Sequence, residues 1–267
     1  MCNNKHDIIT FGRSSIDLYS QNIGAPFNLI KGFDAFVGGS PLNIAVGCSR
    51  LGLDASLLSA VGEDKVGEFL INFLTEEGVN ITNVPTKKGT RTSAVILGIE
   101  PPDKFPLVYY RDNASDSQVD IDDVDRANIS DYKVLLINGT AMNIEPTRSA
   151  TFHATEIALK SDLEVVLDLD FRADQWHDYR AFGVTMRAIL PRVKIAIGTE
   201  EEILAATMEN VSQVEIKDQQ ISAPEIKGDI DLAIKKILAT GVETLIVKRG
   251  EKGASIHSHD GTMTSVP

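Results

Sequence analysis

The stretch that decides the fold is Val37-Gly38-Gly39-Ser40-Pro41-Leu42-Asn43-Ile44-Ala45, a glycine pair laid against the start of a helix. The alternating residues 33–37 before it predict a strand. Ser40 supplies an oxygen suited to an N-cap, and Pro41 suits the first helical position. The two glycines let a ligand approach the backbone, and the free N–H groups of the first helical turn can donate to its oxygens. The stretch therefore predicts a polar-ligand site at a strand-to-helix junction.

Composition narrows the class of protein. The 267 residues allow one large α/β core, which we expect to be a single domain over 1–267. The net charge of −12 (26 basic minus 38 acidic side chains) disfavours nucleic acid or an anionic membrane as a partner. Only Cys2 and Cys48 are present, so neither a disulfide framework nor a thiolate metal site is indicated. The polar amino terminus and the lack of a membrane-length apolar run favour a cytoplasmic protein.

Strand-like and helix-like segments alternate along most of the chain, which predicts a mostly parallel sheet flanked by helices. The expected strands are 8–11, 56–61, 132–137, 164–169, 193–197 and 243–247, and the expected helices begin near 40, 66, 146, 179, 199 and 229. Two segments, about 14–37 and 89–111, are strand-like with no helix until their ends. The second folds back at Pro101-Pro102-Asp103, so a small antiparallel layer is expected, as a lid or as an edge hairpin.

Several candidate ligand-binding residues follow predicted strands. Asp17 comes after the first strand, where ligands collect in an open α/β sheet, and its carboxylate can accept from two hydroxyls; a cap or turn role is the alternative. Tyr109 and Arg111 share one face of a strand, and Arg172 follows another strand. Two arginines can clamp a carboxylate. The alternative is that they form structural bridges, for which Asp168 or Asp170 could serve.

Two later segments could face a nucleotide. Gly198-Thr199-Glu200-Glu201-Glu202 begins a helix, whose dipole alone would favour the acidic side chains. Lys248-Arg249-Gly250-Glu251-Lys252-Gly253 leaves a strand, and its glycines permit either a hairpin turn or a turn close to a nucleotide. The five histidines show no metal-ligand spacing.

The spacing of Gly38, Gly39, Asn43, Ala45, Gly52 and Gly62 resembles the first signature of the PfkB (ribokinase-like) carbohydrate kinases. The resemblance implies a ribokinase-like α/β fold with a small β lid, often a homodimer contact, and the use of ATP and Mg²⁺. It also implies that Asp17, Gly38, Gly39 and Asn43 bind the sugar, that Glu201 helps to hold the metal, and that Lys248, Gly250 and Gly253 border the nucleotide. Gly198 replaces the asparagine usual in the metal motif.

Further segments resemble the 5-dehydro-2-deoxygluconokinase branch of that family, which acts on an acidic keto sugar of inositol breakdown. They are Asp168-Leu169-Asp170-Phe171-Arg172 with Trp176, Gly12-Arg13 with Asp17-Leu18-Tyr19, and residues 101–107. The related 2-keto-3-deoxygluconate kinases share the Tyr-Tyr-Arg and the later arginine, which implies that Tyr109, Arg111 and Arg172 touch a substrate carboxylate. A 2-keto-3-deoxygluconate kinase or a fructokinase-like kinase remains the alternative.

The second family signature, a Gly-Ala-Gly-Asp-like turn that carries the catalytic aspartate, is expected beyond Pro267. No Gly-x-Gly-Asp occurs within the sequence. A general base contributes about 10² to 10⁴ in rate, so we expect this C-terminally incomplete chain to be inactive. A non-catalytic ligand-binding protein is the competing interpretation. A dinucleotide-dependent oxidoreductase is disfavoured, because Gly12-Arg13-Ser14-Ser15 does not supply the Gly-x-Gly-x-x-Gly turn.

Overall fold

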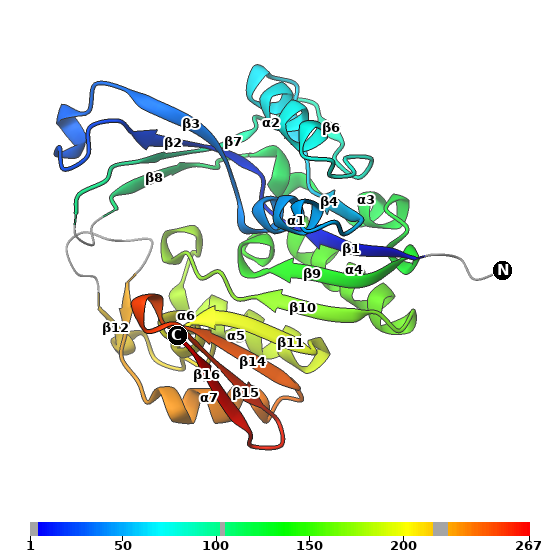
Figure 1. Cartoon of the computed structure of the whole chain (residues 1–267), viewed down its shortest axis with the longest axis vertical. Helices are drawn as coiled ribbons and strands as arrows, with labels where there is room; N and C mark the ends of the chain where they lie inside the picture. Colours follow the sequence, from blue (N-terminus) through cyan, green and yellow to red (C-terminus); the bar gives the residue numbers. More distant parts are fainter. Residues whose placement is uncertain (1–4, 102–104, 216–223) are drawn as a thin grey trace.

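The computed structural model describes residues 5–101, 105–215 and 224–267. Its centre is an eight-stranded sheet in the order β16-β15-β14-β11-β10-β9-β1-β4 (Figure 1). The strands are β1 (His6–Phe11), β4 (Ala55–Leu58), β9 (Tyr132–Asn138), β10 (Glu164–Asp168), β11 (Ile195–Thr199), β14 (Thr244–Lys248), β15 (Ala254–Ser258) and β16 (Met263–Val266). The six strands from β14 to β4 are parallel, and β15 and β16 add an antiparallel hairpin at one edge. The predicted mostly parallel α/β sheet is confirmed.

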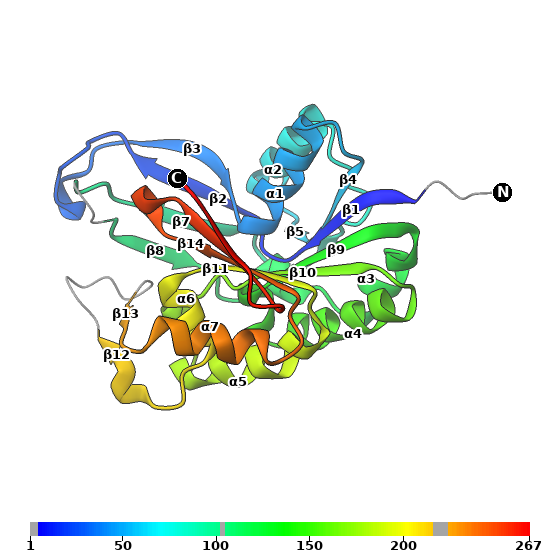
Figure 2. The ribbon, with the colours of Figure 1, turned by 60° about the horizontal axis from the view of Figure 1, so that its bottom comes forward.

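Helices lie on both sides of this sheet (Figure 2). One face carries α3 (Ile121–Arg126), α4 (Thr147–Lys160), α5 (Tyr179–Ile189), α6 (Glu200–Ala206) and α7 (Ile230–Leu238), and α1 (Ser40–Arg50) and α2 (Lys65–Glu76) lie on the opposite side. The largest apolar cluster fills the first face and includes Ile9, Leu135, Leu167 and Phe182. Burial of these side chains is the main force that holds the helices against the sheet.

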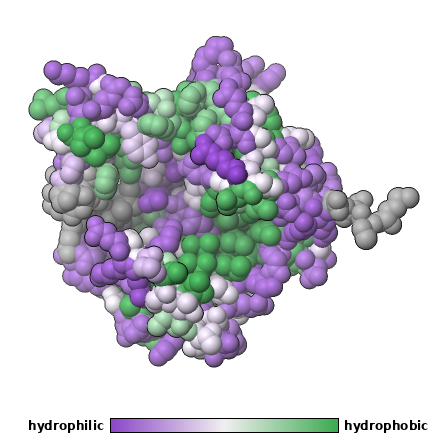
Figure 3. Space-filling view, viewed as in Figure 1, coloured by the Kyte–Doolittle hydropathy of each residue, from purple (hydrophilic) through white to green (hydrophobic). Residues whose placement is uncertain are grey.

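On the second face, α1 covers β4, β1 and β9, while the middle of the sheet is less covered. There Val166, Ile195, Ile197 and Ile246 are only half-buried among the described residues. An apolar patch is visible over this part of the molecule (Figure 3). The helices of the described chain therefore cover the two faces unequally.

The two segments that break the strand–helix alternation build a separate four-stranded sheet, called the lid here. Its order is β3-β2-β7-β8, from β2 (Ser15–Ser20), β3 (Phe33–Gly38), β7 (Ser93–Leu97) and β8 (Leu107–Tyr110). The expected antiparallel pairing of β7 with β8 is confirmed. Residues 102–104 of the predicted corner lie outside the described residues.

Shorter elements complete the chain. Strands β5 (Val61–Gly62) and β6 (Thr86–Lys87) pair in parallel, and β12 (Val214–Glu215) pairs antiparallel with β13 (Glu225–Ile226). The 3-10 helices are η1 (Phe27–Leu29), η2 (Ser115–Gln118), η3 (Ile129–Asp131), η4 (Gly139–Met142), η5 (Ala173–Gln175), η6 (Leu190–Arg192), η7 (Val211–Gln213) and η8 (Gly250–Lys252). No helix in the described part of the chain is long and apolar enough to span a membrane.

The strand-to-helix junction forms where the glycine pair predicts it, but the capping prediction is wrong. Gly39, with φ 100°, occupies the N-cap position of α1, and no side chain caps the helix. Ser40 is already helical, and its hydroxyl donates to the Asp168 carboxylate at the end of β10. Because Ser40 lies one position inside the N-cap, its oxygen is not placed to accept from the amides of the first turn, and its hydroxyl is free to donate to Asp168.

Candidate functional site

Polar side chains gather at one edge of the main sheet. Because β1, β9, β10, β11 and β14 are parallel, their carboxyl ends all lie at that edge, below the lid. The polar residues that end or follow these strands are Arg13, Asn138, Asp168, Asp170, Arg172, Thr199 and Lys248. An open parallel sheet binds its ligands at this edge.

The glycine pair closes one side of the site through backbone packing. A Cβ atom on Gly38 would lie 2.0 Å from Asp17 Oδ1, and one on Gly39 would lie 2.2 Å from the Arg13 carbonyl oxygen. Both contacts are shorter than real carbon contacts allow, and Gly39 also has a φ that disfavours side chains. The glycines therefore allow β3 and α1 to lie directly against Asp17 and the loop after β1.

Asp17 sits on the lid face that looks onto the sheet edge, together with Tyr109. Ser15 Oγ donates to Asp17 Oδ1 at 2.8 Å. Burial raises the pKa of Asp17, although Arg13, Ser15 and Arg172 oppose the shift. Asn43 is exposed on the first turn of α1, close in sequence to the glycines. Asp17 is thus a partly desolvated acceptor in a cationic environment.

Arg111 is held by groups of the protein itself. Its Nε and NH2 donate to Asp116 Oδ2 at 2.9 and 2.6 Å, and NH1 donates to Thr140 O and to Gln175 Oε1. The side chains of Arg111 and Asp116 are only 7% and 0% exposed. Arg111 and Tyr109 nevertheless line a cavity of about 250 Å³ beside the sheet edge. Binding of a substrate carboxylate by Arg111 stays a prediction. Arg111 does form a structural ion pair, but with Asp116, which the sequence did not indicate as its partner.

Arg172 is more open. Its Nε lies 3.0 Å from Asp170 Oδ1, and 35% of its side chain is exposed. Burial lowers the pKa of Arg172, but the Asp170 carboxylate and other anions raise it by more. Asp170 was one of the two bridge partners that the sequence offered, and the structure shows this pair. Burial also raises the pKa of Tyr109, and the charges of Arg13 and Arg172 oppose this shift.

Two aspartates after β10 carry opposite shifts. Burial works against the charge of Asp170, yet Arg172, Arg13 and the donors Thr140 and Asn138 hold its pKa below the usual range. Burial and the neighbouring Asp170 raise the pKa of Asp168, which Lys248 and Ser40 only partly offset. Asp170 has φ 38°, a conformation rare outside glycine, and its hydrogen bonds to Asn138 and Thr140 hold it there.

The predicted nucleotide side surrounds the end of β14. Lys248 Nζ lies 3.5 Å from Asp168 Oδ1 and 3.7 Å from Glu202 Oε2. Glu201 is exposed on the first turn of α6, whereas Glu202 is buried and forms a capping box with Thr199. Burial raises the pKa of Glu202. Glu202, rather than Glu201, therefore faces the sheet edge in this conformation.

The two glycines after β14 differ. A Cβ atom on Gly250 would meet open space, while one on Gly253 would lie 2.0 Å from Val266 O. The packing of the terminal hairpin therefore requires a glycine at position 253. The role of Gly253 at the border of a nucleotide stays a prediction. Among the described residues no group of three or more His, Cys, Asp or Glu side chains could hold a metal ion alone.

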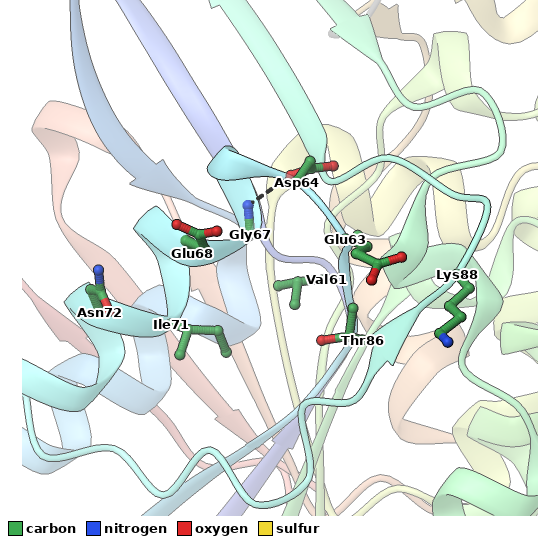
Figure 4. Close-up of a pocket in the computed structure, with 10 residues that line it drawn as sticks. Val61, Glu63, Asp64, Gly67, Glu68, Ile71, Asn72, Thr86 and Lys88 are labelled. Carbon is green, nitrogen blue, oxygen red and sulfur yellow. Dashed lines mark hydrogen bonds between the residues drawn. The ribbon is translucent and has the colours of Figure 1, made fainter.

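A separate groove of about 570 Å³ lies between α2 and the short strands β5 and β6. Its lining includes Glu63, Glu68, Asn72 and Lys88, and Asp64 accepts from the Gly67 amide at the start of α2 (Figure 4). Asp64 also accepts from the backbone and hydroxyl of Thr92, just before β7. These bonds join α2 to the base of the lid.

The sequence missed Arg13, Asn138, Asp116 and Glu202 as members of the site. Arg13 had a usable signal, because it directly follows a glycine at the end of the first strand. Asp116 had none, because nothing in its local pattern indicates that it reaches Arg111.

The family of the chain agrees with a ligand site at the carboxyl ends of the strands. The family model for pfkB family carbohydrate kinases matches residues 5–267. The chain belongs to the PfkB family, and it is a phosphotransferase of the carbohydrate kinase class.

Two similar proteins carry a narrower name. The 5-dehydro-2-deoxygluconokinase of Photobacterium profundum is 34% identical, over 96% of this chain and 73% of that protein. The protein of the same name from Clostridium perfringens is 29% identical, over 96% of this chain and 72% of its own.

Solved structures show the same fold. The Halothermothrix orenii fructokinase has a TM-score of 0.78 and 21% identity, covering 98% of this chain and 85% of that chain. The Xylella fastidiosa fructokinase with bound ATP has a TM-score of 0.81 and 21% identity, over 98% and 78%. The predicted ribokinase-like fold is confirmed.

Proposed function

We propose that the sugar substrate of this kinase is an acidic keto sugar of the 5-dehydro-2-deoxygluconate type, an intermediate of inositol catabolism. The observation that carries the proposal is the charge around Asp17. Arg13 and Arg172 both act on the Asp17 carboxylate and on Tyr109 within one partly buried site. A neutral sugar offers nothing that requires two guanidinium groups, whereas a substrate carboxylate does. The names of the similar proteins support the same substrate.

Roles follow for the predicted substrate residues. Asp17 accepts hydrogen bonds from sugar hydroxyls and thereby orients the acceptor hydroxyl, since positioning supplies much of the catalysis in phosphoryl transfer. Gly38 and Gly39 let the sugar lie against the backbone, and Asn43 adds an amide at the helix start. Tyr109, Arg111 and Arg172 line the end of the site that receives the carboxylate.

For the second substrate we propose ATP with Mg²⁺. Lys248 could bind a phosphate group, because its side chain is 45% exposed and its ammonium group lies at the sheet edge beside Asp168. Gly250 leaves the backbone after β14 open on one side. Glu201 would hold the metal through water, with most ligands supplied by phosphate oxygens, as Mg²⁺ commonly requires. The metal would neutralise charge on the transferred phosphoryl group.

The test measures sugar binding and phosphate transfer with acidic sugars and with fructose. It uses the 267-residue chain and a version extended by a Gly-Ala-Gly-Asp-like segment from a relative. The 267-residue chain should bind the acidic sugar and transfer phosphate at least about 10²-fold more slowly than the extended version, since it lacks that aspartate. Turnover of fructose but not of acidic sugars by the extended version would favour the fructokinase-like alternative. Binding without turnover in both would favour a non-catalytic ligand-binding protein.

We also propose that the lid pairs with a second copy of the chain. The lid face opposite Asp17 is apolar and partly exposed, with Leu18, Phe33, Ile96, Val108 and Tyr110 on it. Phe33, Val108 and Tyr110 are 36%, 43% and 59% exposed. A contiguous apolar sheet face of this kind is unusual on a monomer and is typical of an interface.

A further inference from the structure

Arg13 is a buried guanidinium without a carboxylate partner. It follows β1 and is 6% exposed. Its NH1 donates to Ser15 Oγ at 3.2 Å, its Nε is buried without a hydrogen-bond partner, and its guanidinium carbon lies 5.3 Å from the centre of the Tyr109 ring. Within the described ranges no carboxylate oxygen lies within 4.0 Å of its nitrogens. A buried guanidinium with a free donor and no anion in contact can still bind a carboxylate directly.

The other two arginines of the site differ in this respect. Arg111 is bonded to Asp116 through two nitrogens, and Arg172 is paired with Asp170 at 3.0 Å. Their charges are therefore already compensated inside the protein. Of the three guanidinium groups near Tyr109, Arg13 is the one without a carboxylate in direct contact, although it attracts Asp17 and Asp170 from farther away.

A single hydroxyl links Arg13 to the predicted sugar residue. Ser15 Oγ accepts from Arg13 NH1 and donates to Asp17 Oδ1 at 2.8 Å. The Arg13 carbonyl also packs against Gly39, which leaves no room for a side chain there. Ser15 thus holds the Arg13 guanidinium beside the Asp17 carboxylate, which can accept a hydrogen bond from a sugar hydroxyl.

We propose that Arg13 binds the carboxylate of the substrate and is the residue that selects an acidic over a neutral sugar. The inference rests on the proposed function: the carboxylate of the acidic sugar binds to Arg13, and Arg172 assists. Asp17 then holds a hydroxyl of the same molecule. Arg111, fully engaged with Asp116, Thr140 and Gln175, is a positioning residue for the cavity wall.

The experiment measures binding of 5-dehydro-2-deoxygluconate and of fructose to the 267-residue chain by calorimetry. The variant is Arg13→Met, which keeps an unbranched apolar stem and removes the guanidinium, and the matched control is Arg180→Met, whose arginine is 55% exposed and paired with Asp178. Arg13→Met should weaken binding of the acidic sugar by about tenfold or more. It should change fructose binding by less than threefold, and the control should change neither.

A second readout guards against a misfolded variant. Arg13 attracts Asp17 and Asp170 without touching either, so Arg13→Met should lower the melting temperature by less than Arg111→Met, which breaks a contact pair with the buried Asp116. Arg13→Lys should retain part of the preference for the acidic sugar.

Three outcomes overturn the inference. Acidic-sugar binding that survives in a folded Arg13→Met chain contradicts this inference alone. Equal losses for both sugars show a structural role instead. Failure of the parent chain to bind the acidic sugar contradicts the proposed function and this inference with it.

Discussion

At the scale of single residues, the site is defined by charges taken partly out of water. Asp17, Asp168 and Glu202 all have raised pKa values because burial disfavours their ionised forms. Such shifts gather at functional sites, where stability is given up for chemistry. Asp17 offers a direct test, because burial is the largest cause of its shift.

Asp17→Asn should weaken sugar binding and leave the fold at least as stable at pH 7. The pKa of Asp17 is raised in the folded state, so its ionisation lowers stability as the pH rises through the folded-state value. The variant lacks this penalty, and its advantage over the parent chain should shrink as the pH falls through that value. Urea denaturation at pH 7 and at pH 4 measures the difference. An advantage that grows at low pH would contradict the assignment.

Sequence patterns predicted part of this site. The sequence pattern indicated that Asp17, the glycine pair and Arg172 lie near the sheet edge, although Asp17 is within β2 of the lid and not in a loop after β1. The partner of Arg111 could not be predicted, because Asp116 reaches it only through the packing of the lid on the main sheet. Arg13 was visible in the sequence, but its lack of a partner is a property of the folded chain.

At the scale of elements, the turn from β3 into α1 depends on backbone packing. Gly39→Ala should destabilise the chain by about 1–3 kcal/mol, because the residue has φ 100° and its Cβ would meet the Arg13 carbonyl at 2.2 Å. Gly47→Ala is the matched control within α1, where a Cβ meets nothing within 4 Å. The control should be neutral or stabilise by up to about 1 kcal/mol. Chemical denaturation distinguishes the two, and equal effects would refute the close-approach argument.

The Arg111–Asp116 pair ties the end of β8 to the segment before α3. Arg111→Met should destabilise the chain by about 3–5 kcal/mol, because it leaves the fully buried Asp116 carboxylate without its cation. Arg180→Met removes an exposed pair and should leave the melting temperature almost unchanged. Thermal melting of both variants provides the comparison; a neutral Arg111→Met would show that the pair contributes little.

Most elements were predictable, since their periodicities are strong and glycines mark their ends. The capping of α1 was not, because the choice between a helix cap and Asp168 depends on a residue 128 positions away. The predicted strand 56–61 also divides into β4 and β5, which belong to different sheets.

At the scale of the whole molecule, the lid has one face toward the site and one apolar face outward. If two copies pair through the outer face, Val108→Glu should shift the chain toward monomer in sedimentation experiments. Leu51→Glu is the control, because Leu51 is 84% exposed at the end of α1 and lies off the lid. A parent chain that is monomeric at high concentration would refute the interface.

We infer from the charges around Asp17 that the site binds an acidic sugar in preference to a neutral one. The most direct measurement is the affinity of the parent chain for 5-dehydro-2-deoxygluconate and for fructose, determined by calorimetry at pH 7 in one buffer. We expect the acidic sugar to bind at least about tenfold more tightly, since a charge-assisted hydrogen bond contributes about 1.5–3 kcal/mol. Equal affinities, or tighter binding of fructose, would contradict it.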